Sequence, residues 1–211
     1  FPRVNFQGVD MARKRNTGTE AKIKEAFTAL LREKGFDAMT VSDIARTAGI
    51  NRGTFYMHYM DKFDLRQQLI DNATMDLRDI LTPPAIASHA TQPDRHVSTL
   101  DVIAPQAILR ALQYVKNDAA FFDAISQSGQ DMRMYDETKT ILKKMLEDNA
   151  ARMRVKPTLG GLPATYGYEI VVSSVTSIIW LWIRRGFLET PEAITKYIEL
   201  NKRLSPVALL R

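Results

Sequence analysis

One segment of the sequence, from Thr40 to Lys62, gathers side chains that suit the binding of a polyanion. It reads TVSDIARTAGINRGTFYMHYMDK, and its second half combines small, aromatic and hydrogen-bonding residues. An arginine such as Arg52 can make a bidentate contact with a guanine edge or pair with a phosphate. Tyrosine, threonine, histidine and lysine side chains can reach phosphate oxygens. These residue types indicate reversible recognition through hydrogen bonds and charge.

The rest of the 211 residues offers little for catalysis or metal binding. The absence of cysteine excludes disulfides, thiolate metal sites and a cysteine nucleophile. The three histidines, His58, His89 and His96, do not have the spacing of a metal site. The acidic pairs at 136–137 and 147–148 lack a histidine partner, and we interpret them as solvated helix faces. Without a glycine-rich phosphate loop or a nucleophile elbow, we expect no enzyme, no metal and no cofactor.

The charge balance permits a polyanionic partner without requiring one. Lysine and arginine number 29 against 24 aspartates and glutamates, which gives a net charge of +5. Residues 11–65 carry a net +3, so their basic groups must cluster on one face to matter. Arg13, Lys14 and Arg15 form a basic group near the start of the sequence. It is either a solvated end or a flexible arm that enters a minor groove or screens phosphates.

Capping and breaking residues predict the helices that position the polar segment. Four helix starts are predicted at capping residues, at Thr17, Thr40, Asn51 and Asp61. Gly35 is predicted to end the first helix and Gly49 the second, because glycine readily adopts the left-handed conformation at a helix end. Two short helices around a glycine turn, with a longer helix before them, make a helix-turn-helix arrangement.

Helical periodicity continues to the C-terminus, and we find no convincing strand pattern. Further helical segments are predicted over about 108–115, 121–125, 131–154, 164–185 and 191–204, with loops over 82–99 and 157–163. The predicted fold class is therefore all-α with about nine helices. We expect three parts: residues 1–10 as the remnant of a protease-cleavable tag, 11–61 as the helix-turn-helix domain, and 62–211 as a larger helical domain.

The segment around the glycine turn resembles the TetR/AcrR family of bacterial transcriptional regulators. The matching residues are Thr40, Ile44, Ala45, Ala48-Gly49, Gly53-Thr54, Tyr56, His58, Tyr59, Lys62 and Leu65. Two positions depart from the family pattern: Tyr59 stands where phenylalanine is common, and Met60 where proline or a small residue is common. The resemblance implies a homodimer with an N-terminal DNA-binding domain. It also implies a C-terminal domain that carries the dimer interface and a ligand pocket.

The resemblance also implies roles for individual residues of the motif. The positions expected to face DNA bases are Arg52, Gly53 and Tyr56. The positions expected to contact phosphates are Thr40, Thr54, His58 and Lys62. For His58 the alternative is a surface histidine without a role.

The C-terminal part carries two weaker site predictions. A ligand pocket is predicted from methionine and aromatic residues, at Tyr114, Phe121, Phe122, Met134 and Met145, with ordinary core packing as the alternative. The last 45 residues or so also resemble one branch of the family, near dihydroxyacetone-kinase operon activators. A broad apolar stripe there predicts a four-helix dimer interface that includes Val171, Val175, Ile178, Trp182, Tyr197 and Ile198.

Together these features predict a ligand-responsive homodimeric repressor that binds a palindromic double-stranded DNA operator. The alternative is an activator of the same fold that acts through a protein co-regulator rather than a small-molecule effector. The longest apolar run, Ile170 to Ile183, has fourteen residues with hydroxyl groups among them, and is too short and polar for a bilayer of roughly 30 Å. No apolar leader follows Met11. We therefore expect a cytoplasmic protein that does not bind membranes.

Overall fold

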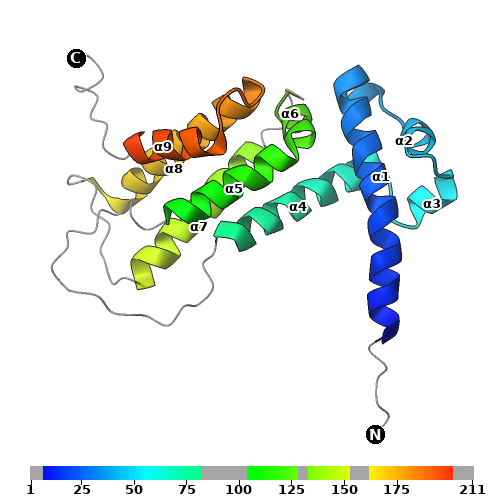
Figure 1. The fold of residues 1–211 in the computed structure, drawn as a ribbon, viewed down its shortest axis with the longest axis horizontal. Coiled ribbons are helices and arrows are strands. Elements are labelled where there is room, and N and C mark those ends of the chain that lie inside the picture. The colour runs from blue at the N-terminus through cyan, green and yellow to red at the C-terminus, as the bar shows by residue number, and fades with distance from the viewer. Residues whose placement is uncertain (1–6, 82–103, 128–132, 153–161, 202–211) are drawn as a thin grey trace, which may run out of the picture. The chain divides into compact units, whose positions relative to one another are not determined.

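The described part of the chain is entirely helical in architecture (Figure 1). The computed structural model describes residues 7–81, 104–127, 133–152 and 162–201. Within these ranges it forms nine helices, which confirms the predicted fold class. They are α1 (Gln7–Ala38), α2 (Val41–Thr47), α3 (Arg52–Tyr56), α4 (Lys62–Leu81), α5 (Pro105–Asn117), α6 (Ala119–Gln127), α7 (Arg133–Arg152), α8 (Ala164–Arg184) and α9 (Pro191–Asn201).

The helices form two compact units that divide between Asp71 and Asn72, inside α4. The sequence placed the boundary earlier, after Asp61. The difference arises because the first half of α4 packs with the N-terminal helices: Leu65 and Ile70 are buried, and the Phe63 ring meets the Phe36 ring edge-on at 5.2 Å between centroids.

Helix α1 begins earlier than its capping signal predicted. The sequence placed its start at Thr17, whereas the helical backbone begins at Gln7. The predicted basic arm, residues 13–15, therefore lies within helical backbone rather than in an extended tail. The side chains of residues 7–17 lie outside the described residues. At the other end Gly35 has φ 77° and interrupts the helix, as predicted.

The predicted caps of the next three helices are confirmed. The Thr40 hydroxyl accepts from the Asp43 amide at 3.1 Å at the start of α2. The Asn51 Oδ1 accepts from the Thr54 amide at 2.7 Å at the start of α3. The Asp61 carboxylate accepts two amides of the first turn of α4. Gly49, at φ 66°, makes the turn between α2 and α3.

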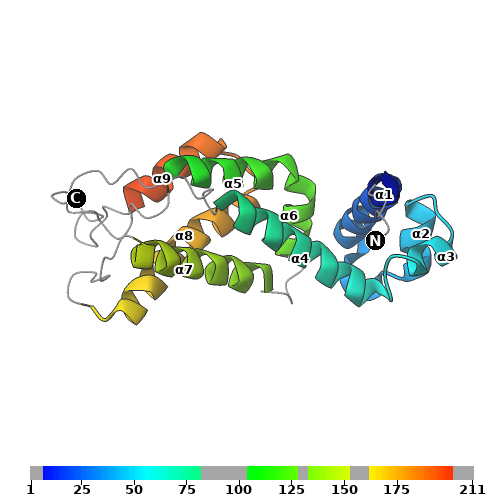
Figure 2. The same ribbon diagram turned by 90° about the horizontal axis from the view of Figure 1, so that it is seen from below.

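In the C-terminal unit, α5 packs beside α9, and α8 contacts α6, α7 and α9 (Figures 1 and 2). By length and composition alone α8 could cross a membrane, although its apolar run seemed too short in the sequence. Its buried residues, which include Val172, Thr176 and Trp182, face neighbouring helices. Helix α8 is thus a core helix of this unit, and Gly186, at φ 70°, follows its end as predicted.

Candidate nucleic-acid interface and C-terminal cavity

A small apolar core fixes α2 and α3 against α1. Ile44 and Phe55 are fully buried between these helices, and Tyr59 packs against the Phe55 ring at 5.7 Å between centroids. Burial raises the pKa of Tyr59 to about 12, with the carboxylates of Glu20 and Asp64 as smaller causes. This core leaves the remaining side chains of α3 on the outside.

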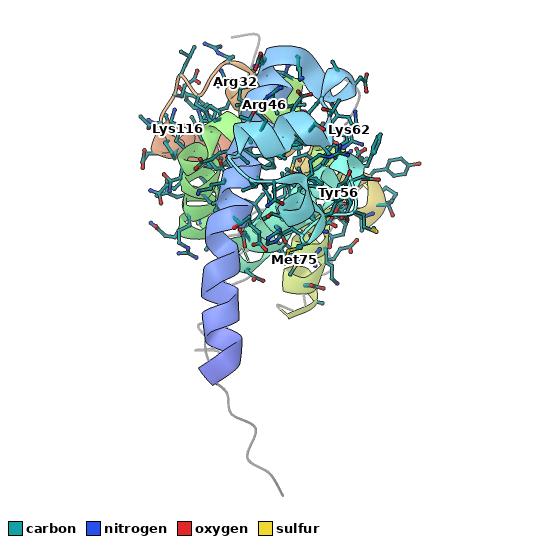
Figure 3. The ribbon with its side chains drawn as sticks, turned by 90° about the vertical axis from the view of Figure 1, so that its right-hand side faces the viewer. Arg32, Arg46, Tyr56, Lys62, Met75 and Lys116 are labelled. Atoms are coloured by element: carbon teal, nitrogen blue, oxygen red, sulfur yellow. The ribbon has the colours of Figure 1, made fainter. Side chains whose placement is uncertain are left out.

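Arg52 and Tyr56 form one exposed pair on the outer face of α3. One terminal nitrogen of Arg52 donates to the Tyr56 hydroxyl at 3.3 Å, and the guanidinium lies 5.9 Å from the ring centroid. The Tyr56 side chain is 49% exposed, and Figure 3 labels it among the side chains of the helix-turn-helix. A Cβ at Gly53 would lie 3.1 Å from the Asn51 Oδ1 that caps the helix. A glycine at position 53 therefore leaves the cap undisturbed and the backbone accessible.

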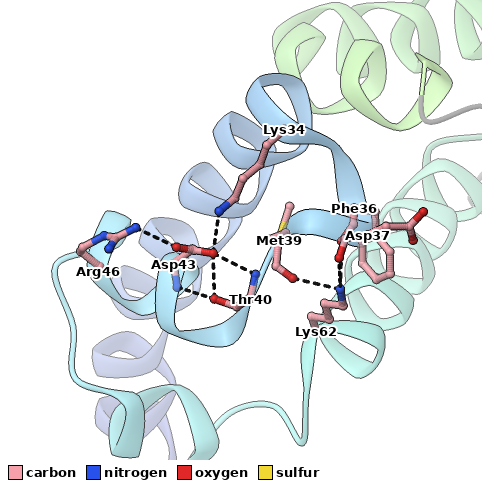
Figure 4. Close-up of polar contacts among 8 residues, drawn as sticks. All are labelled: Lys34, Phe36, Asp37, Met39, Thr40, Asp43, Arg46 and Lys62. Atoms are coloured by element: carbon pink, nitrogen blue, oxygen red, sulfur yellow. Dashed lines mark hydrogen bonds and ion pairs between the residues drawn. The ribbon is translucent and has the colours of Figure 1, made fainter.

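Lys62 does not present a free ammonium group for a phosphate, contrary to the sequence prediction. Its Nζ donates to the carbonyls of Phe36, Asp37 and Met39 at 3.0, 3.0 and 2.9 Å (Figure 4). It also lies 4.8 Å from the centroid of the Phe36 ring. The three carbonyls follow Gly35, where the helical backbone is interrupted, and precede the start of α2 at Val41. An ammonium has three hydrogens, so Lys62 uses all of them to hold α4 to α1.

The other three predicted phosphate contacts are also engaged within the unit. The Thr40 hydroxyl donates to Asp43 at 2.7 Å, and the Thr54 hydroxyl donates to the Asn51 Oδ1 at 3.1 Å. The His58 side chain is 9% exposed, with Nδ1 3.5 Å from the Glu20 carboxylate of α1. These positions match the family pattern, but in this structure the Thr40 and Thr54 side chains take part in helix caps and the His58 side chain contacts α1. A phosphate contact from the hydroxyl hydrogen of Thr40 or Thr54 requires breaking an existing hydrogen bond.

Asp43 organises a polar network that sequence reasoning recognised only as a cap. Its carboxylate accepts from the Lys34 ammonium at 2.6 Å, from Thr40, and from Arg46 at 2.7 Å (Figure 4). The hydrogen bond from Lys34 is the main cause that holds the pKa of Asp43 well below its usual range, followed by that from Thr40. The Arg46 side chain nevertheless remains 77% exposed. The i, i+3 spacing of Asp43 and Arg46 was the available signal for their pairing.

The C-terminal unit contains a cavity of about 260 Å³. Phe122 and Met134 line it as predicted, whereas Tyr114, Phe121 and Met145 do not. The Tyr114 hydroxyl donates instead to Asp76 of α4 at 2.7 Å, and Phe121 and Met145 are buried in the surrounding core. The walls are mainly aliphatic and come from α4, α5, α6, α7, α8 and α9, with Leu77, Leu112, Ile141, Val175 and Ile198 among them.

The predicted dimer residues separate into buried and surface groups. Trp182 and Ile198 are 1% and 0% exposed within one chain, so they cannot form a contact surface, contrary to prediction. Trp182 donates from Nε1 to the Glu189 carbonyl at 2.9 Å and packs on Phe187, which explains its burial. Val171 and Val175 line the cavity. Tyr197, which was among the predicted residues, is exposed. Four further apolar residues of α8 and α9 are also exposed: Tyr166, Ile170, Leu181 and Leu200.

Comparison with known proteins agrees with the helix-turn-helix geometry. Residues 23–69 match the family described as "Bacterial regulatory proteins, tetR family", and residues 104–200 match "Transcriptional regulator C-terminal region". These matches cover both structural units. The chain is a DNA-binding transcriptional regulator, and the matching families and relatives are regulators rather than enzymes. It belongs to the TetR family of bacterial transcriptional regulators.

Individual relatives share only limited sequence with this chain. The regulator YxbF of Bacillus subtilis is 24% identical over 85% of the chain, which spans 43% of that relative's length. The repressor BepR of Brucella suis is 24% identical over 80% of this chain and 83% of its own. The solved structure of the dihydroxyacetone kinase operon activator DhaS is 18% identical over 88% of this chain and 94% of its own. Its TM-score of 0.59 shows a shared fold.

Proposed function

We propose that this chain is a ligand-responsive, homodimeric repressor that binds a palindromic DNA operator in the bacterial cytoplasm. Support for repression comes from the relative BepR, which is named a repressor and aligns over most of both chains. Support for a cytoplasmic location comes from the family, whose bacterial members are soluble DNA-binding proteins. The cavity in the C-terminal unit supports a response to a small molecule.

The observation that carries the DNA proposal is the exposed Arg52–Tyr56 pair on α3. Arg52 presents a planar fork of donors, and the aromatic ring of Tyr56 beside it limits the orientations of that fork. In our proposal α3 enters the major groove, where Arg52 reads a guanine and Gly53 lets the backbone approach closely. Arg46, whose side chain is exposed on α2, is proposed as a phosphate contact in place of Lys62.

A second chain is proposed to cover the apolar strip of α8 and α9, defined by Tyr166, Ile170, Leu181, Tyr197 and Leu200. These α8 residues lie on one helical face, because their spacings are close to multiples of 3.6. A helix that leaves such a face exposed in one chain suits a symmetric contact with the same face of another. Two helices from each chain would then form a four-helix interface.

The test of DNA recognition compares Arg52→Ala with Arg78→Ala, an equal loss of charge on an exposed residue of the C-terminal unit. Genomic fragments retained by the full-length protein at about 150 mM salt are sequenced. We expect retention of one inverted repeat, and a loss of base preference of roughly 1–3 kcal/mol for Arg52→Ala only. If both variants select the same site as the parent protein, Arg52 does not read bases.

Retention of the same fragments can also distinguish a repressor that a small ligand releases from DNA from an activator that acts through a protein co-regulator. If a metabolite extract passed through a small-molecule filter releases the operator, a small effector exists. If only the protein fraction changes retention, the activator alternative replaces the repressor proposal.

A further inference from the structure

The walls of the C-terminal cavity carry no charge among the described residues. The lining is aliphatic and aromatic except for four polar side chains: Thr138, Ser174, Thr176 and Asn201. A carboxylate or an ammonium group in such a cavity would lose its hydration without gaining an opposite charge, which strongly disfavours the ionised form. The lining therefore selects against charged ligands.

Three of the four polar side chains already have partners. The Thr138 hydroxyl donates to the Met134 carbonyl at 2.7 Å, and the Ser174 hydroxyl donates to the Val171 carbonyl at 2.9 Å. The Asn201 amide in turn donates to the Ser174 hydroxyl at 2.8 Å, which joins α9 to α8. These groups contribute to the structure without a ligand.

Thr176 is different, because its hydroxyl is buried and has no hydrogen-bond partner among the described residues. The residue lies in the cavity wall and is 1% exposed. A buried hydroxyl without a hydrogen-bond partner destabilises the fold, because it has lost its hydrogen bonds to water. A ligand that supplies a hydrogen-bond partner removes this cost and therefore binds more favourably.

We propose that the cavity binds an uncharged, largely apolar molecule whose single hydroxyl or carbonyl group pairs with Thr176. The volume of about 260 Å³ lies just below the range of about 300–1,000 Å³ that is usual for small-molecule sites, which favours a small ligand. This inference rests on the proposed ligand response and specifies the chemical class of the effector.

The test uses three probes with the same eight-carbon chain: octan-1-ol, octanoate and octylammonium. Each is titrated into the full chain at pH 7.4 while tryptophan fluorescence is followed, because Trp180 lines the cavity. A thermal-shift measurement provides a second readout. We expect octan-1-ol to bind at least about ten times more tightly than either charged probe, given the cost of burying an unpaired charge. Equal or tighter binding of octanoate or octylammonium would overturn the proposal.

Thr176→Val tests the hydrogen bond, because valine keeps the shape and removes the hydroxyl. Thr138→Val is the matched control, since it removes a lining hydroxyl that already has a partner. We expect Thr176→Val to weaken octan-1-ol binding about 2–10-fold, and Thr138→Val to leave it unchanged. The proposal fails if the two variants lose affinity equally, or if the parent binds none of the three probes. DNA retention, measured separately without probes, reports on the proposed DNA function independently.

Discussion

Replacing Lys62 separates a structural role from a DNA contact, because the two roles predict opposite results. In Lys62→Met the apolar stem is largely kept, while three carbonyls at the end of α1 lose their donor. A hydrogen bond to a charged group contributes about 1.5–3 kcal/mol, and bonds that share one ammonium do not add fully. Since the group is partly exposed, we expect a loss of about 2 kcal/mol from the N-terminal unit.

The assay is unfolding by urea and by heat, followed by far-UV circular dichroism. For a unit of this size, about 2 kcal/mol corresponds to a midpoint lowered by about 10 °C. Lys22→Met, at an exposed position on α1, provides the control with the same change of charge. We expect its free energy of unfolding to stay within about 0.5 kcal/mol of the parent value, as is usual for surface substitutions.

DNA binding by the same variants completes the test. The loss of one phosphate contact would reduce the magnitude of the slope of log affinity against log salt concentration by about 0.9. If Lys62 has only a structural role, its replacement leaves this slope unchanged as long as the protein is folded. Binding to a random-sequence duplex is therefore measured by fluorescence anisotropy at 15 °C over a range of salt concentrations. If Lys62→Met keeps the parent stability and loses about one unit of slope, our assignment of Lys62 is wrong.

Three further predictions concern pH, assembly and packing. The pKa of Asp43 is lower in the folded than in the unfolded protein, so its carboxylate stabilises the fold above about pH 4, and this stabilisation is lost as the pH falls through the folded pKa. Asp43→Asn should therefore be less stable than the parent at pH 7 in urea titrations, and the difference should shrink in acid. The control Asp37→Asn should show no such pH-dependent difference. Leu181→Glu, at a position 59% exposed on the α8 strip, should convert a dimer to a monomer, as measured by light scattering. Leu188→Glu, beyond the end of α8, should remain a dimer. If the two variants have the same molecular mass, the interface lies elsewhere. Tyr114→Phe should cost about 1–3 kcal/mol in thermal unfolding of the C-terminal unit, because its hydroxyl donates to a carboxylate of α4; an unchanged midpoint would show that this bond contributes nothing.

The sequence predicted the N-terminal fold well because its signals are local. A cap needs a side chain and an amide three residues away, so Thr40 and Asn51 could be identified without knowledge of tertiary contacts. The exposure of Arg52 also follows from helical spacing around buried Phe55. The engagement of Lys62 was not predictable in this way, because its partners lie more than 20 residues earlier in the chain.

The C-terminal site was less predictable because its geometry depends on packing between distant helices. A broad apolar stripe identified α8 as a packing helix but could not separate Trp182, which is buried, from Leu181, which is exposed. Both fit an apolar pattern, and only the chain reversal at Gly186 brings Phe187 onto the Trp182 ring. Similarly, methionine and aromatic composition suggested a cavity, whereas most of its walls are aliphatic side chains from several helices.

The side-chain caps at the starts of α2, α3 and α4 have a consequence for the energetics of recognition. Thr40 with Asp43, Asn51 with Thr54, and Asp61 with the first turn of α4 fix the three helix starts before any partner arrives. Side chains that are already ordered lose little conformational entropy on association, where each mobile one would cost about 0.5–1.5 kcal/mol. The starts of these three helices are thus preorganised, and this part of the ordering has already occurred during folding.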